Sequence, residues 1–145
     1  MNGNARIGHS RRGACFYDTN VVAAYMLSEE GRVEKAEEVL RACMERGLSV
    51  ITIHELVYLA TRRGLGGRLG EALMLIKSVF RIHGLGEKEA LRAAGIRAEY
   101  RLPEVDSLIL ATAVENGYQV FYTFDSDFRK LNGLTLGGTR VVYLS

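Results

Sequence analysis

Apolar residues along the chain alternate between short unbroken runs and longer stretches with helical spacing. The short runs are rich in aromatic and β-branched residues and predict strands at 14–17, 48–53, 118–124 and 140–144, with a further short strand at 82–85. Between these runs, apolar residues recur every three or four positions, which predicts helices. The helical stretches begin near Thr19, Val33, Glu55, Ala72, Glu87 and Pro103, and a small one lies near Phe128.

The alternation of strands with helices predicts the fold class. Parallel strands are joined by right-handed crossovers that place helices on both faces of a sheet. We therefore expect an α/β protein, a three-layer α/β/α sandwich with a central parallel sheet, formed by a single domain at residues 14–145. Residues 1–13 combine arginines with Gly, Asn and Ser without periodicity, and we expect them to be a mobile N-terminal tail.

Composition narrows the class of protein without deciding its function. Of 145 residues, 48% are hydrophobic and the formal net charge is only +2, so overall charge alone does not indicate a nucleic-acid partner. No apolar run is long enough to cross a bilayer, and we expect a soluble, cytoplasmic protein without membrane contacts. In such a compartment Cys15 and Cys43 are expected to be buried thiols rather than a disulfide.

Carboxylates occupy selected places on this scaffold. Asp18, Glu55 and Asp125 each follow the C-terminal end of a predicted strand. Asp106 lies one turn into a predicted helix, on the face that also carries apolar residues. If the strands are parallel, all four side chains converge at one edge of the sheet, where ligands gather in open α/β folds.

Convergence of four carboxylates points to a metal-dependent reaction. Like charges within a few ångströms oppose each other's ionisation, and a divalent cation removes this conflict. Mg²⁺ and Mn²⁺ prefer oxygen ligands, and Mg²⁺ commonly shares its coordination with substrate phosphate. Such an ion polarises a phosphoryl oxygen and activates water, which is the chemistry of phosphodiester hydrolysis.

Each acidic residue also has a simpler interpretation. Thr52 to Glu55 forms a good capping box, and Asp18 and Asp125 have the residue type favoured at helix N-caps. Asp106 lies beyond a cap position, so a capping role does not account for it. Asp127 is a weaker candidate than Asp125. It is interpreted as a direct metal ligand, as a neighbour of the ligands or as a solvated side chain. Three short polar residues flank the acids, namely Thr19, Asn20 and Thr123. They are either supporting groups at the site or ordinary helix-start and strand-end residues.

Four segments carry a resemblance to a known family. They are FYDTN at 16–20, TIHE at 52–55, LPEVD at 102–106 leading into ILATA at 109–113, and YTFDSDF at 122–128. In this order they closely resemble the PIN domain, and in particular the small ribonuclease toxins of VapC type. The resemblance extends over nearly the whole of residues 14–144, and its last two segments are the most specific.

This resemblance implies an Mg²⁺- or Mn²⁺-dependent endoribonuclease that acts as the toxin of a toxin–antitoxin pair. It assigns Asp18, Glu55, Asp106 and Asp125 to the acidic quartet and places Asp127 beside them. It also implies a homodimer and a cognate antitoxin whose tail blocks the site. Two alternatives remain: a non-catalytic PIN-fold module that binds RNA or protein, and a nuclease that processes ribosomal RNA.

Basic and aromatic residues near the acids are candidates for RNA contacts. Arg62 and Arg63 close the helix that contains Glu55, and Arg129 and Lys130 follow the Asp125 segment. Either pair can meet RNA phosphates, although basic residues are also favoured at helix C-termini and on solvated faces. Three tyrosines within apolar patterns are expected to serve core or dimer packing rather than base stacking: Tyr17, Tyr58 and Tyr122.

Overall fold

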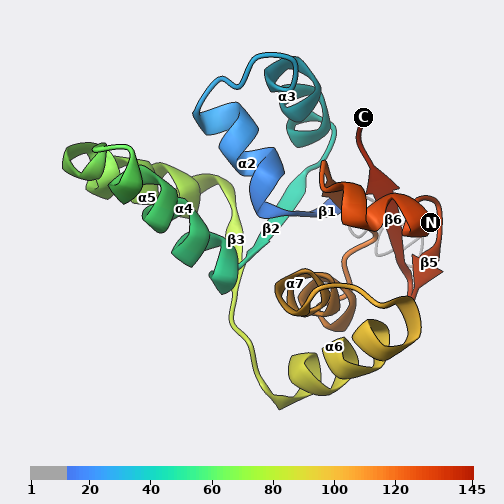
Figure 1. Cartoon of the computed structure of the whole chain (residues 1–145). Coiled ribbons are helices and arrows are strands. Elements are labelled where there is room, and N and C mark those ends of the chain that lie inside the picture. The colour runs from blue at the N-terminus through green and yellow to red at the C-terminus, as the bar shows by residue number, and fades with distance from the viewer. Residues whose placement is uncertain (1–12) are drawn as a thin grey trace, which may run out of the picture.

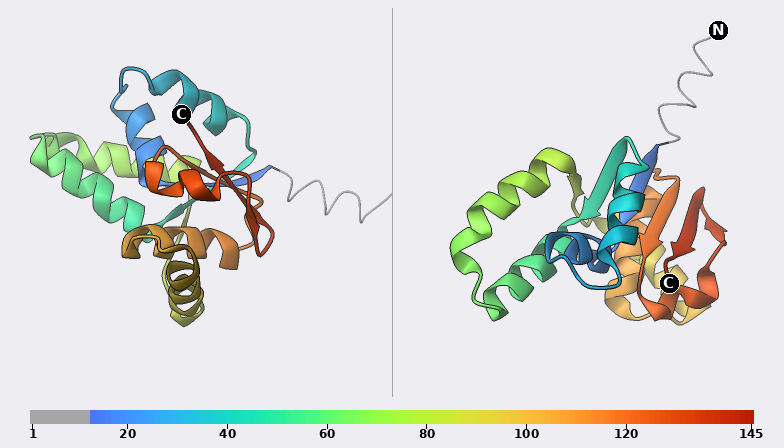
Figure 2. Two further views of the ribbon diagram at one scale, coloured as in Figure 1. Left: turned by 45° about the vertical axis from the view of Figure 1, so that its right-hand side comes forward. Right: turned by 90° about the horizontal axis from the view of Figure 1, so that it is seen from above.

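In a computed structural model of the protein, which describes residues 13–145, a six-stranded sheet lies between two groups of helices (Figure 1, Figure 2). The strand order is β3-β2-β1-β4-β6-β5, and every neighbouring pair is parallel except β5 with β6. The predicted three-layer α/β/α sandwich is therefore confirmed, with one short antiparallel strand added at its edge. The strands are β1 (Ala14–Tyr17), β2 (Glu45–Ser49), β3 (Arg81–His83), β4 (Val120–Thr123), β5 (Thr135–Leu136) and β6 (Thr139–Tyr143).

The helices divide between the two faces of the sheet. Figure 1 shows α6 and α7 below the sheet, α2 and α3 above it, and α4 with α5 as a pair extending to one side. The α-helices are α2 (Thr19–Met26), α3 (Val33–Arg41), α4 (Val50–Arg62), α5 (Leu69–Val79), α6 (Glu87–Tyr100) and α7 (Glu104–Glu115). Two 3₁₀-helices accompany them, η1 (Gly66–Arg68) and η2 (Ser126–Leu131).

Two apolar cores cover the sheet because successive strand residues point to opposite faces. Phe16 of β1 packs with α6 and α7, whereas its neighbours Cys15 and Tyr17 pack with α2, α3 and α5. In β4, Phe121 joins the first core and Val120 and Tyr122 contact the second. This double-sided burial explains why the central strands read as unbroken apolar runs.

One predicted strand is misplaced. The run at 48–53 was expected to be a strand, but β2 ends at Ser49 and α4 begins at Val50. The Ser49 hydroxyl accepts a hydrogen bond from the Ile51 N–H at 3.0 Å and caps the helix. This cap, together with the packing of Ile51 and Ile53 against the two cores, overrides the local β-preference of the run. The capping box at Thr52–Glu55 is consequently also wrong, because Thr52 lies inside the helix.

The expected mobile tail at residues 1–13 lies outside the described residues, except for Gly13.

Within residues 13–145, no helix has both the length and the apolar content that crossing a membrane demands.

The expectation of two separate thiols is wrong, because Cys15 and Cys43 form a disulfide with their Cα atoms 6.0 Å apart. Cys15 lies in β1, and Cys43 lies just before β2. Since β2 pairs with β1 in parallel, with Ala14 opposite Glu45, the segment that enters β2 passes directly beside Cys15. The bridge thus follows from strand adjacency, which cysteine spacing does not reveal.

The disulfide should contribute measurably to stability. It closes a loop across a sequence separation of 28 residues, for which the chain-entropy relation gives about 3–4 kcal/mol. We expect a reducing agent to lower the free energy of unfolding by about that amount in urea titrations. The double variant Cys15→Ala/Cys43→Ala should not respond to the reducing agent, and identical midpoints for oxidised and reduced wild type would contradict the prediction.

Candidate metal centre

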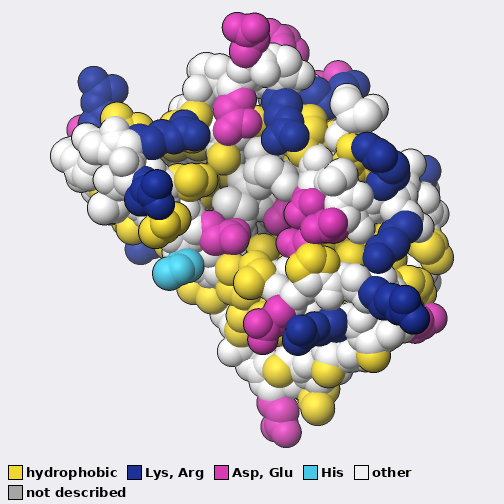
Figure 3. All heavy atoms as spheres, viewed as in Figure 1, with side chains coloured by type: hydrophobic (Ala, Val, Ile, Leu, Met, Phe, Trp, Pro, Cys, Tyr) yellow, Lys and Arg dark blue, Asp and Glu magenta, His cyan; other side chains and the backbone are white. Residues whose placement is uncertain are grey.

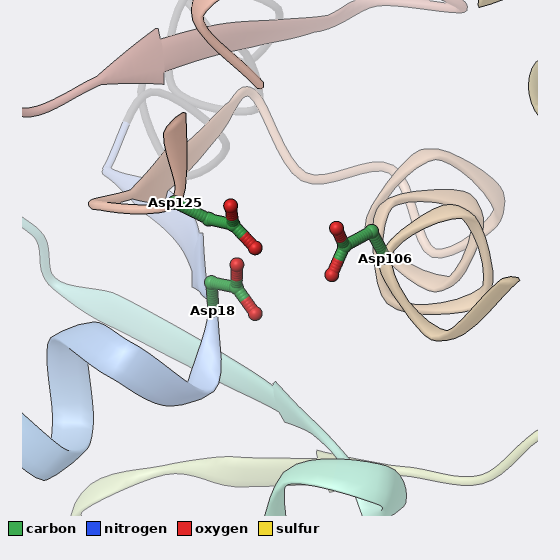
Figure 4. Close-up of side chains that lie close together, drawn as sticks. All are labelled: Asp18, Asp106 and Asp125. Carbon is green, nitrogen blue, oxygen red and sulfur yellow. The ribbon is translucent and has the colours of Figure 1, made fainter. Parts of the chain in front are cut away.

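Three aspartates from separate elements converge at the carboxyl edge of the sheet. Asp18 follows β1, Asp125 follows β4 by two residues, and Asp106 lies in the first turn of α7. One carboxylate oxygen from each lies within 4.8 Å of the others. Figure 4 shows Asp18 and Asp125 side by side, with Asp106 reaching toward them from α7.

Strand pairing brings the first two aspartates together. β1 and β4 are parallel neighbours with Tyr17 opposite Tyr122, so the residues that follow the two strands emerge side by side. Both aspartates are also helix caps, as the simpler interpretation held: Asp18 accepts from the Thr19 N–H and Asp125 from the Asp127 N–H, each at 2.9 Å. Capping and convergence are therefore compatible in this fold.

Two of the expected supporting residues fix the orientation of these acids. The Thr123 hydroxyl donates to an Asp18 carboxylate oxygen at 2.8 Å and accepts from the Asp125 N–H at 2.9 Å. Asn20 accepts from the Phe124 N–H at 2.9 Å, and its amide nitrogen lies 3.4 Å from the Asp18 carboxylate. Thr123 and Asn20 thus tie the end of β4 to the end of β1.

Glu55 lies at the edge of the cluster. It lines the same cavity as the three aspartates but is not part of the group whose oxygens meet within 4.8 Å. The Thr19 hydroxyl contacts its carboxylate and also lies 2.9 Å from the Thr52 hydroxyl, so Thr19 links α2 to α4 beneath the cavity. The interpretation of Glu55 as a capping residue is wrong, since it lies in the second turn of α4.

Asp127 lies outside the converging group. It is exposed in η2, and its backbone N–H rather than its carboxylate contacts Asp125. Its charge is nevertheless close enough to oppose ionisation of Asp106. Every aspartate of the chain is accordingly either in the cluster or beside it.

Burial and mutual repulsion weaken the acidity of the cluster. Asp18 is only 4% exposed, and burial raises its pKa to about 6 although Thr123 and Thr19 donate hydrogen bonds to it. Burial is also the main reason that the pKa of Asp106 is raised, and the charges of Asp18 and Asp125 add to the effect. Within residues 13–145, no salt bridge joins a Lys or Arg to any of these aspartates.

The donor set fits a hard divalent cation. Carboxylate oxygens without sulfur or imidazole ligands suit Mg²⁺ or Mn²⁺. A doubly charged ion would also stabilise these carboxylates in their ionised form, because no Lys or Arg of the described residues forms a salt bridge with them. Asp18, Asp106 and Asp125 are therefore the residues that fit the expected metal, and Glu55 lines the same cavity at the edge of the cluster.

The acids line a cavity of about 410 Å³, which is open on one face of the molecule. Figure 3 shows acidic side chains gathered in this hollow, with Lys and Arg side chains on several sides of it. Of the predicted basic residues, Arg63 lines the cavity. Five residues outside the predicted site also line it, namely Ala23, Glu29, Arg32, Tyr58 and Leu59.

The other predicted basic residues have neighbours of their own. Arg62 donates to the Tyr58 hydroxyl at 2.8 Å. Arg129 lies 3.2 Å from the Tyr143 hydroxyl, and Lys130 lies 3.4 Å from a backbone carbonyl. Among the residues described, the cations that line the acid cavity are Arg32 and Arg63.

Comparisons with known proteins confirm the resemblance noted in the sequence. The family model described as PIN domain matches residues 15–134. A comparison with curated proteins finds no match.

Solved structures of similar fold include toxin–antitoxin proteins. A toxin–antitoxin complex from Klebsiella pneumoniae is 26% identical with a TM-score of 0.67, over 87% of this chain and 95% of that chain. FitAcB from Neisseria gonorrhoeae is 23% identical with a TM-score of 0.67, over 88% and 96%. VapC20 from Mycobacterium tuberculosis, a toxin that cleaves the sarcin–ricin loop, is 24% identical with a TM-score of 0.65, over 81% and 94%.

The raised pKa values predict how pH affects the metal-free protein. A carboxyl whose pKa is higher in the folded than in the unfolded state stabilises the fold below its unfolded value of 3.8. That contribution is lost as pH rises through the folded value, which for Asp18 is about 6. With EDTA present, Asp106→Asn should therefore gain stability over wild type between about pH 5 and pH 8, by on the order of 1 kcal/mol after solvent screening.

Urea unfolding at several pH values measures this difference directly. Glu34→Gln is the matched control, because Glu34 is an exposed carboxylate of α3. Its unfolding free energy should run parallel to that of wild type across the pH range. The prediction fails if Asp106→Asn also runs parallel to wild type.

Proposed function

Because this chain belongs to the PIN domain family, we propose that it is a metal-dependent endoribonuclease and the toxin of a toxin–antitoxin pair. The observation that carries the proposal is the convergence of Asp18, Asp106 and Asp125 in an open cavity, with no basic side chain paired to them within the described residues. Such a site suits a divalent cation and a phosphate-bearing substrate together.

In this proposal Asp18, Asp106 and Asp125 hold Mg²⁺ or Mn²⁺, and Glu55 completes the acidic quartet. When bound, such an ion supplies Lewis-acid polarisation of a phosphodiester and lowers the pKa of water to make a nucleophile. The Thr123 hydroxyl and the Thr19 N–H keep Asp18 in one orientation, because each donates a hydrogen bond to one of its two carboxylate oxygens. Asp127 adds negative charge at the rim of the site.

Phosphate must enter a cavity that is otherwise acidic. Arg63 at the end of α4 lines the cavity and offers positive charge to the backbone of an RNA substrate. Glu55, which the Thr19 hydroxyl contacts, lines the same cavity and would accept a proton from an attacking water. These side chains would orient the substrate while the aspartates hold the ion.

The proposed partners follow from the family and from the solved neighbours. The Klebsiella pneumoniae structure is a toxin–antitoxin complex, so we propose a small antitoxin protein as the inhibitor of this chain. RNA is the proposed substrate, a homodimer the proposed assembly and the cytoplasm the proposed location.

Loss of one aspartate should abolish RNA cleavage without unfolding the protein. We expect Asp18→Asn and Asp106→Asn each to lower the rate of cleavage with Mg²⁺ or Mn²⁺ by at least about 100-fold, because changes merely next to metal ligands already cost 10- to 100-fold. Gel assays of RNA cleavage measure the rate, and circular dichroism checks the fold. Glu34→Gln should retain wild-type activity, whereas retained cleavage in both aspartate variants would eliminate this mechanism.

Metal binding distinguishes the nuclease from a non-catalytic module of the same fold. A filled site should raise the melting temperature by mass action, and Mn²⁺ titration in a thermal-shift assay measures this effect. Wild type should respond and Asp106→Asn should respond much less. If metal leaves the melting temperature of wild type unchanged, the acids serve as caps and the module interpretation replaces the enzyme.

A further inference from the structure

The cavity wall carries an exposed aromatic ring that the metal site does not use. Tyr58 lies in α4 one turn beyond Glu55, lines the acid cavity and is 53% exposed. The Arg62 guanidinium lies 5.7 Å from the centre of its ring and donates to its hydroxyl at 2.8 Å. Arg62 therefore covers part of the ring and holds it in one orientation.

A guanidinium is fixed at another part of the same wall. Arg32, just before α3, lies over the ring of Phe124 with 4.8 Å between the guanidinium carbon and the ring centre. Phe124 is buried and directly precedes Asp125, so its position is set by the core. The one salt bridge that Arg32 makes within residues 13–145 is with Glu29 at 4.0 Å, the outer limit of such a contact. Arg32 therefore lines the cavity without a close carboxylate partner among the described residues.

Resting on the ribonuclease function proposed above, we propose that the cavity binds one unpaired nucleotide, with its base stacked on Tyr58 and its phosphate held by Arg32. A cavity of about 410 Å³ has the size of a small-molecule site. Bases within a duplex are covered on both faces by their neighbours, so only an unpaired base can stack on a tyrosine.

This assignment is an alternative to the expectation that Tyr58 serves core or dimer packing. Core packing predicts a buried ring, whereas Tyr58 is 53% exposed in the single chain. Tyr25 provides a contrast in the same protein: it is 43% exposed, but it lines a different cavity between α2 and α5. Tyr25→Leu is accordingly the matched control for Tyr58→Leu.

Equilibrium binding separates the contribution of the base from that of the phosphate. We would measure fluorescence anisotropy with Mg²⁺ in the Asp106→Asn background, which suppresses cleavage. The probes are a single-stranded RNA octamer and an inorganic polyphosphate of similar charge. Tyr58→Leu should weaken RNA binding about 5- to 100-fold, the range for loss of one base–aromatic stack, and should leave polyphosphate binding unchanged. Tyr58→Phe and Tyr25→Leu should bind both probes like the parent.

Arg32→Gln should show the complementary pattern. It should weaken the RNA and the polyphosphate by similar factors and reduce the slope of log affinity against log salt by about one. An octamer that carries 2-aminopurine adds a spectroscopic readout, because its fluorescence should be quenched on binding to the parent and not on binding to Tyr58→Leu. Circular dichroism of each variant, with Tyr58→Gln as a second substitution, excludes a folding defect as the cause.

Three results would overturn the inference. Unchanged RNA affinity in Tyr58→Leu, or an equal loss for RNA and polyphosphate, would remove the base-stacking role while leaving the ribonuclease proposal intact. If Tyr58→Leu weakens the binding of a fully paired duplex RNA as much as that of the single-stranded octamer, the preference for an unpaired nucleotide is removed. If the parent binds neither probe, this inference falls, whereas the ribonuclease proposal is decided separately by RNA cleavage with the wild type.

Discussion

Repulsion among three carboxylates is the interaction around which the site is organised. Asp18, Asp106 and Asp125 bring their oxygens within 4.8 Å of one another in a partly buried cavity, and burial raises the pKa of Asp18 and of Asp106. No Lys or Arg in the described part of the chain forms a salt bridge with them. The arrangement fits a divalent cation, because such an ion would replace the repulsion among the carboxylates with attraction to the metal.

The sheet makes this concentration of charge possible. Adjacent parallel strands β1 and β4 deliver Asp18 and Asp125 to the same edge, and Thr123 and Asn20 tie the two strand ends by hydrogen bonds. Two apolar cores on the faces of the sheet hold these strands, while α7 supplies Asp106 from one face. The basic and aromatic groups near the cavity come from the opposite face, at α4 and before α3. The negative charges therefore come from the sheet edge and α7, whereas the basic groups and the exposed tyrosine come from the layer on the other face.

Sequence patterns predicted the parts of the fold that depend on local chemistry. Ala14–Tyr17 and the helix that carries Asp106 were identified because uninterrupted apolar runs and helical spacing are properties of the segment alone. The start of α4 was not identified, because Val50 and Ile51 favour a strand locally. The Ser49 cap and the packing of Ile51 against the core make this segment helical. The disulfide was missed because the pairing of β1 with β2, not the cysteine spacing, brings Cys15 to Cys43. Tyr58 was assigned to packing because its apolar neighbours in sequence do not reveal which face of α4 reaches the cavity.

A crystal structure of the protein soaked with Mn²⁺ tests the central claim most directly, through the anomalous signal of the metal. The account predicts an anomalous peak within coordination distance of the carboxylates of Asp18, Asp106 and Asp125. It is contradicted if, at saturating metal and neutral pH, these three side chains surround no ion.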